Sequence, residues 1–391
     1  MRNGVKVYDC DTHLRPTVET IIPYLDRELR EQAPHWAKVP VRVGMAGERY
    51  QPPHRHYFRF RTRDQGWNKE SMRMLGQAAA PEHGERQFQR FMGEKLPRYG
   101  GGDFDAEARI RDMDEEGVDV HMMIPGGIPG TDDADLEMAF IRAQHRYLND
   151  FTSKDPARLK SLIIASGLRV EDSVKEIKKW RRSAWAVGVE PRLALDQPLD
   201  HPDLEPIWRA ADEEGLSVVH HSFSFGFPGY RDLWDNRFIG RLASHPWGAM
   251  RAMPAFFGCG ILDRYPNIRF GILESGFGWL PFWASRMDDQ AIYIGEGAIP
   301  DNLQHKFSEY MVGGRFFAGI VIHEGEKMAK MVTDFLGDHV LMYASDYPHA
   351  ESRFPASIDK VLSWNSLGPK ALRKLMWENA VRFYGEPSEK A

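Results

Sequence analysis

The sequence lacks the marks of three large classes of protein. No run of about 18 apolar residues is present, so no segment is expected to cross a membrane as a helix. Two cysteines, Cys10 and Cys259, are too few for a disulfide framework. The first residues contain no signal-peptide core, because Asp9 and Asp11 interrupt the apolar run there. We therefore expect a cytoplasmic protein that has no membrane partner.

The chain also lacks an excess of positive charge. It carries 51 Lys and Arg against 56 Asp and Glu, a formal net charge of −5. Proteins that bind nucleic acid usually show a basic surface, so nucleic acid is not expected as a partner. Hydrophobic residues make up 42% of the 391 residues, which is enough for a large core. The length suits an α/β barrel that carries insertions.

Apolar, strand-like segments alternate with helical segments through most of the chain. Strands are predicted over residues 5–13, 118–124, 162–165, 186–190, 216–221, 268–274, 317–323 and 340–346. Strands that are apolar along their whole length indicate burial on both faces, and helices between them indicate parallel pairing. No Gly-x-Gly-x-x-Gly motif follows the first strand, which disfavours a dinucleotide-binding open sheet. The predicted fold class is therefore α/β, a (β/α)8 TIM barrel.

One long segment interrupts this alternation. Residues 14–103 are rich in Pro, Gly, Arg and aromatic residues, with one helix predicted over residues 18–31. A structureless stretch of this length is uncommon in a compact domain unless it is functional. We predict an insertion subdomain near the barrel mouth, between a first strand at residues 1–13 and the rest of one catalytic domain at residues 104–391. Four arginines in it suit either an anionic substrate group or a solvated basic face: Arg55, Arg59, Arg61 and Arg63.

Polar side chains fall at the C-terminal ends of the otherwise apolar strands. They are Asp11 and His13 on the first strand, Glu190 on the fourth, His220 and His221 on the fifth, Glu274 on the sixth and Asp346 on the eighth. Active sites of (β/α)8 barrels lie at these ends. Carboxylates and imidazoles are ligands of Zn²⁺, Fe²⁺ and Mn²⁺, and an apolar mouth holds such charges poorly without a cation. A salt-bridged polar layer without metal is the competing interpretation.

The first strand carries the pattern Asp-x-Asp-x-His. Alternate side chains of a strand point to the same face, so we expect Asp9, Asp11 and His13 to share one face. Cys10 is out of phase with them and is expected to face the helix layer as a small core residue. By itself this pattern also suits a turn cap. The polar ends of the other strands favour a pair of metal ligands at Asp11 and His13, with Asp9 in support.

Eight short segments also follow one another in a recognisable order. They cover residues 9–13, 112–119, 155–159, 215–221, 245–247, 262–267, 278–281 and 344–349. Together they resemble the amidohydrolase superfamily, specifically the branch of aminocarboxymuconate-semialdehyde decarboxylase and related aromatic-acid decarboxylases. The resemblance implies metal ligands at His13, at His221 and at Asp346, which would also transfer protons. A slip of one residue would select His220 instead of His221. The resemblance also implies a homodimer.

Two positions depart from the pattern of the decarboxylases. Those enzymes usually carry a histidine on strand six, where this chain has Glu274 and Ser275. Glu190 resembles the strand-four carboxylate that bridges two metals in other amidohydrolases. Asp11 stands where the family has the first histidine of a His-x-His pair. These carboxylates favour two hard cations and hydrolysis over decarboxylation.

The leading prediction is a metal-dependent hydrolase with two divalent ions, Zn, Fe or Mn, and a metal-activated water. It would cleave an ester, thioester or amide bond of an apolar or aromatic acyl substrate, because an aromatic loop at residues 222–230 and Trp279 follow the strand ends. The predicted metal ligands are Asp11, His13, Glu190, His221, Glu274 and Asp346. The predicted catalytic residues are Asp346, His220 and His245, although His245 equally suits a helix cap. The alternatives are a single-metal, non-oxidative decarboxylase of an aromatic or unsaturated acid, and a non-catalytic barrel.

Overall fold

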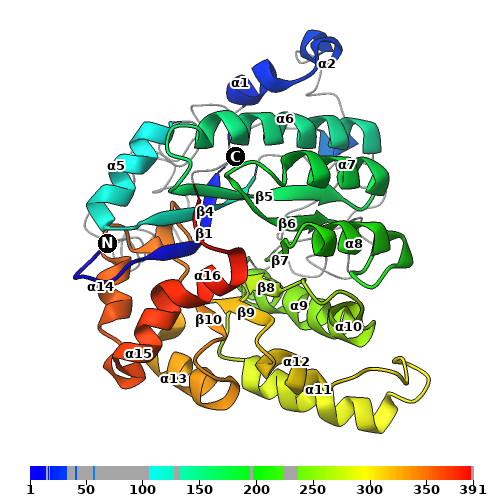
Figure 1. Cartoon of the computed structure of the whole chain (residues 1–391), viewed down its shortest axis with the longest axis vertical. Helices are drawn as coiled ribbons and strands as arrows, with labels where there is room; N and C mark the ends of the chain where they lie inside the picture. The colour runs from blue at the N-terminus through cyan, green and yellow to red at the C-terminus, as the bar shows by residue number, and fades with distance from the viewer. Residues whose placement is uncertain are drawn as a thin grey trace.

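The computed structural model describes residues 1–14, 16, 18–32, 40–41, 56–57, 105–126, 133–193, 197–222 and 237–388. Eight parallel strands follow one another around a barrel in chain order (Figure 1). They are β1 (Tyr8–Leu14), β4 (Val120–Pro125), β5 (Leu159–Ser166), β6 (Ala186–Arg192), β7 (Ser217–His221), β8 (Phe270–Leu273), β9 (Phe316–Gly319) and β10 (Leu341–Met342). The chain after β10 closes the barrel on β1, since Cys10 N donates to Tyr343 O over 2.9 Å. The predicted (β/α)8 barrel is confirmed.

Helices cover the outside of the barrel between the strands. They are α5 (Ala106–Glu116), α6 (Ala134–Thr152), α7 (Val170–Trp180), α8 (Glu205–Glu213), α9 (Arg237–Gly258), α10 (Ile261–Arg264), α11 (Leu280–Ile294), α12 (Phe307–Val312), α13 (Gly325–Leu336), α14 (Ser357–Leu362), α15 (Gly368–Arg373) and α16 (Asn379–Tyr384). Local sequence sets their ends: Asp105 caps α5 by accepting from Ala108 N, and Gly117 follows it at a φ of 90°. None of the described helices is long and apolar enough to cross a membrane.

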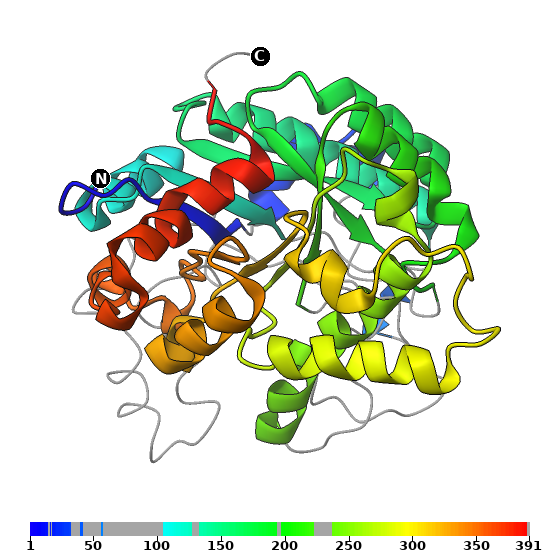
Figure 2. The same ribbon diagram turned by 60° about the horizontal axis from the view of Figure 1, so that its bottom comes forward.

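The last helix fills the barrel from the end where the strands begin. Figure 2 shows α16, in red, lying across this end of the barrel. Phe383 and Tyr384 pack into the interior cluster, and Arg269, just before β8, donates to Phe383 O over 2.8 Å. A Cβ at Gly271 would lie 2.5 Å from Phe383 Cζ, so only glycine admits this ring. The opposite end, at the C-termini of the strands, is therefore the end available for a site.

A bulge in β1 decides which of its side chains reach that end. The register with β4 shifts between Asp9 and Thr12. Cys10 packs in the barrel interior, with its Sγ 3.9 Å from Met342 Sδ, so the expectation that it faces the helix layer was wrong. Asp9 accepts hydrogen bonds from the amides of Asp11 and Ser345 over 3.3 and 3.0 Å. Asp9 thus supports the strand end from behind.

Two of the predicted element boundaries were also wrong. The helix expected over residues 18–31 is divided into α1 (Val18–Ile21), a 3-10 turn (Ile22–Tyr24) and α2 (Arg27–Gln32). Pro23 explains the break, because it lacks an amide hydrogen and its ring crowds the preceding turn. The strand expected over residues 317–323 ends at Gly319, and a 3-10 turn (Ile322–Glu324) follows it.

The insertion predicted over residues 14–103 lies mostly outside the described residues. Besides α1 and α2, its described part contains one short antiparallel pair, β2 (Pro40–Val41) with β3 (His56–Tyr57). Arg55, Arg59, Arg61 and Arg63 fall outside the described residues, as do residues 223–230 of the aromatic loop. The position of this subdomain near the mouth stays a prediction.

Candidate metal centre

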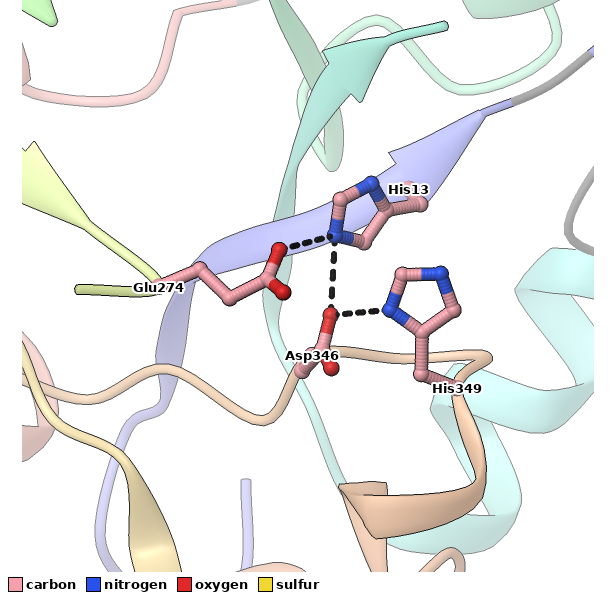
Figure 3. Close-up of side chains that lie close together, drawn as sticks. All are labelled: His13, Glu274, Asp346 and His349. Atoms are coloured by element: carbon pink, nitrogen blue, oxygen red, sulfur yellow. Dashed lines mark hydrogen bonds and ion pairs between the residues drawn. The ribbon is translucent and has the colours of Figure 1, made fainter. Parts of the chain in front are cut away.

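Four side chains from three distant parts of the chain meet at the C-terminal end of the barrel (Figure 3). His13 lies near the end of β1, Glu274 directly follows β8, and Asp346 and His349 lie in the loop after β10. His13 Nε2 lies 2.8 Å from Asp346 Oδ1 and 3.4 Å from Glu274 Oε2. His349 Nδ1 lies 2.5 Å from Asp346 Oδ1. The group could hold a metal ion.

A second group overlaps the first through His13. It consists of Asp11, His13 and His221, all buried. Asp11 Oδ1 lies 3.6 Å from His13 Nε2 and 3.5 Å from His221 Nε2, and His221 Nε2 lies 3.1 Å from Glu274 Oε2. The other nitrogen of His221, Nδ1, lies 2.8 Å from Ser222 O. A carbonyl at Nδ1 keeps the proton on that nitrogen and turns the Nε2 lone pair toward a cation.

Neighbouring donor atoms of the two groups have the spacing of ligands that share an ion. Two ligands bound about 2.0–2.2 Å from a metal at angles of about 90–109° lie about 2.8–3.6 Å apart. Five of the distances among Asp11, His13, His221, Glu274 and Asp346 run from 2.8 to 3.6 Å, and the donors divide into two groups that share His13. Among the described residues, Asp11 Oδ1, His221 Nε2 and Glu274 Oε2 have no hydrogen-bond partner. These buried donors fit a divalent cation.

The pKa shifts of the clustered side chains also favour a bound cation. Burial opposes charge on His221, yet Asp11 and Glu274 raise its pKa well above the usual value. Burial disfavours the charged form of Glu274, but His13 and His221, whose Nε2 atoms lie 3.4 and 3.1 Å from its Oε2, hold its pKa well below the usual value. Burial and the neighbouring Glu274 raise the pKa of Asp346 to about 6. Three buried carboxylates lie together here, and a cation would relieve their repulsion.

Both carboxylates that follow strands have left-handed backbone. The φ angles are 47° at Glu274 and 65° at Asp346, which is uncommon for residues other than glycine. The turn after Glu274 is held by the partly buried carboxylate of Glu324, which accepts from Phe277 N and Gly278 N over 3.0 and 2.7 Å. Trp279, which the sequence places after this strand end, donates from Nε1 to Ser275 O over 2.9 Å within the same turn.

His220 and Glu190 were predicted site residues, and neither belongs to the two donor groups found among the described residues. The Glu190 carboxylate is still close enough to interact electrostatically with His221 and His13. His220 alternates with His221 along β7 and shares its face with Val218, which packs in the core outside the barrel. Burial lowers the pKa of His220 to about 3, so it is neutral. Glu190 is buried on β6, but none of its oxygens joins the two donor groups found among the described residues. Burial raises the pKa of Glu190.

Two histidines border the cluster. His245, on α9, lies with Nε2 3.7 Å from Glu274 Oε1, so it is near the site as predicted. His349 was not among the predicted site residues. It belongs to the segment 344–349 that carries the family resemblance, and its spacing of three residues from Asp346 is the signal that would have indicated it.

Comparisons with known proteins give a family match and several similar structures. The family model described as amidohydrolase matches residues 8–385. An amidohydrolase from Mycobacterium avium subsp. paratuberculosis is similar in structure, with 16% identity, 98% of each chain covered and a TM-score of 0.68. A second similar structure is the 5-carboxyvanillate decarboxylase from Novosphingobium aromaticivorans, solved with manganese and 4-hydroxy-3-methoxy-5-nitrobenzoic acid. It is 18% identical, the match covers 98% of the present chain and 97% of that chain, and the TM-score is 0.65. A 2,6-dihydroxybenzoate decarboxylase, solved with 2,6-dihydroxybenzoate, is 14% identical. The match covers 80% of the present chain and 94% of that chain, with a TM-score of 0.58. At these identities the likeness demonstrates a shared fold.

Proposed function

Because the chain belongs to the amidohydrolase family, we propose that it is a non-oxidative decarboxylase of a small aromatic or unsaturated carboxylic acid that uses one divalent metal ion. This proposal reverses the order of the two functions that the sequence suggested. The observation that carries it is that the two donor groups share His13, whose Nε2 lies 2.8–3.6 Å from the carboxylates of Asp11, Glu274 and Asp346. A two-metal site places its ions about 3.5–4 Å apart, and one imidazole nitrogen cannot bind both ions. The decarboxylases among the similar structures support the same choice.

Asp11, His13, His221, Glu274 and Asp346 would hold the ion, and manganese is the first candidate because a similar structure contains it. A divalent ion held here would act as a Lewis acid toward the substrate carboxylate and offset the negative charge of the site. The carboxylate-rich donor set equally suits Fe²⁺ and Zn²⁺.

The chain's own residues supply the proton. Asp346, in its protonated form, donates a proton to the substrate carbon that bears the carboxylate, and a new C–H bond forms. The C–C bond to the carboxylate then breaks, its electron pair returns to the unsaturated system, and carbon dioxide leaves. His349 Nδ1 contacts Asp346 Oδ1, and the His349 side chain is 15% exposed. His349 therefore returns a proton from solvent to Asp346 after each turnover.

Hydrolysis of an ester, thioester or amide is the second candidate function. One observation favours it: Glu274 occupies the end of β8, the sixth barrel strand, where the resemblance predicts a histidine. His245 weakens this argument, because its imidazole lies 3.7 Å from Glu274 Oε1 and supplies a ring close to that position. The homodimer stays a prediction from the resemblance.

One experiment separates the two functions. The manganese-loaded protein is incubated in D2O with a panel of hydroxy- and methoxybenzoic acids and, separately, with aryl esters, thioesters and amides. A decarboxylase releases carbon dioxide and leaves one deuterium on the product carbon, and Asp346→Asn abolishes both. Release of an acid and an alcohol, thiol or amine, with no carbon dioxide from any member of the panel, would establish hydrolysis instead.

A further inference from the structure

A fully buried arginine lies behind the candidate metal centre, on the helix layer side of β1. Arg109 projects from α5 and is 0% exposed. Its Nη2 donates to the backbone carbonyl of His13. Its Nη1 donates to Thr12 Oγ1 over 3.1 Å and lies 3.2 Å from His121 Nδ1. Thr12 and His13 lie near the C-terminal end of β1, which borders the site, and His121 lies near the start of β4.

The surroundings of Arg109 are built to keep its guanidinium in one orientation. Burying a cation is costly unless polar groups surround it, so its position depends on these acceptors. Burial and the charges of Arg109 and Arg158 hold the pKa of His121 well below its usual value, so its ring is neutral. The Nδ1 atom of the neutral ring can accept a hydrogen bond from Arg109. The Thr12 hydroxyl in turn donates a hydrogen bond to Met122 O over 3.0 Å. The acceptors of Arg109 are therefore themselves fixed.

Helix α5 also contacts the loop that follows β10, which lies across the seam between the first and last strands. Asp112, nearly one turn after Arg109 on α5, accepts a hydrogen bond from Tyr347 Oη over 2.7 Å. The Arg109 guanidinium carbon lies 5.0 Å from the centre of the Tyr347 ring. Tyr347 directly follows Asp346, and its carbonyl accepts from His13 N over 2.6 Å.

We infer that Arg109 and Asp112 form a clamp on α5 that sets the distance between His13 and Asp346. Arg109 acts on the segment that carries His13, and Asp112 acts through Tyr347 on the segment that carries Asp346. Both are positioning residues, because neither belongs to the donor cluster found among the described residues. The inference rests on the metal ion of the proposed function.

The test measures metal binding directly, with Co²⁺ as a spectroscopic probe. Arg109→Ala removes the guanidinium, and Tyr347→Phe removes only the hydroxyl that binds Asp112. Arg111→Ala is the matched control, since Arg111 is exposed on the same helix. We expect Arg109→Ala to weaken Co²⁺ binding by about 10–100-fold and Tyr347→Phe to weaken it less, with altered ligand-field bands in both. Millimolar guanidinium should restore the bands of Arg109→Ala, while methylammonium should not.

The outcomes distinguish failure of the clamp from failure of the proposed function. Wild-type protein that binds no Co²⁺, Mn²⁺ or Zn²⁺ overturns the metal site and the clamp with it. Wild-type protein that binds Co²⁺, with unchanged affinity and spectrum in both variants, overturns the clamp alone. If Arg109→Ala does not fold, Tyr347→Phe decides: an unchanged spectrum and affinity reject the clamp, and a changed spectrum with weaker binding supports it.

Discussion

His13 Nε2 and Asp346 Oδ1 lie 2.8 Å apart, although one residue belongs to the first barrel strand and the other follows the last. Closure of the barrel brings them together, since Asp346 N donates to Asp11 O over 2.9 Å. The candidate metal centre is therefore assembled across the seam of the barrel. Because a metal that binds only the folded state stabilises that state, metal binding and barrel closure should be coupled.

Adjacent histidines on β7 should differ sharply in their effect on metal content. His221→Ala removes a donor of the cluster, so we expect the purified protein to lose its bound metal. His220→Ala leaves the donors in place and should retain about one equivalent per chain, although the cavity it leaves lowers the thermal midpoint. Elemental analysis of both variants checks this. Equal metal loss in the two variants would show that the position of His220 in this structure does not separate it from the site.

The buried carboxylates of Glu274 and Glu190 should also differ in their effect on metal binding. Glu274→Gln weakens a donor that lies 3.1 Å from His221 and 3.4 Å from His13, so metal affinity should fall more than about 10-fold. Glu190→Gln should leave both affinity and stoichiometry unchanged, because Glu190 stands outside the donor groups among the described residues. Calorimetric titration with Mn²⁺ measures both quantities. A stoichiometry of two that falls to one in Glu190→Gln would restore the binuclear interpretation.

His349 should affect turnover more than metal content. His349→Gln removes the imidazole that contacts Asp346 Oδ1, so proton return to Asp346 slows and kcat should fall by about 10–100-fold. Metal content should remain within about twofold of wild type, because His349 Nδ1 is engaged with Asp346 Oδ1 and the other donors of both groups remain. Steady-state kinetics and elemental analysis on the same samples test this. Loss of the metal would instead identify His349 as a ligand.

Stability should depend on pH through Glu116, a buried residue of α5. Burial raises the pKa of Glu116 from 4.5 to about 7, and its carboxylate accepts from Ser357 N over 3.1 Å. Because the folded state holds this proton more tightly, the contribution of Glu116 to stability is complete below about pH 4.5. It is lost as the pH rises through about 7. Glu116→Gln is neutral throughout, so its stability relative to wild type should rise between pH 5 and pH 8 by at most about 3 kcal/mol.

Urea unfolding of wild type and Glu116→Gln at pH 5 and pH 8 measures this difference. Glu107→Gln is the control, since Glu107 is exposed on the same helix and should follow the wild-type pH dependence. If the free energy of unfolding changed with pH in the same way in wild type and Glu116→Gln, the raised pKa of Glu116 would be contradicted.

The sequence by itself determined the barrel and most of its elements. Burial on both faces requires strands that are apolar throughout, and helix ends such as Asp105 and Gly117 depend on residues only a few positions away. The same local information marked Asp11, His13, Glu274 and Asp346, because a charged side chain at the end of an apolar strand is visible without the fold.

Only the tertiary structure decided which of these side chains meet. The bulge in β1 turned Cys10 into the barrel interior, and the register of β7 separated His221 from His220. Closure of the seam brought His13 to Asp346, and the packing of α5 placed Arg109 behind His13. These relationships depend on pairing between residues far apart in the chain, and no local pattern encodes the distance between them.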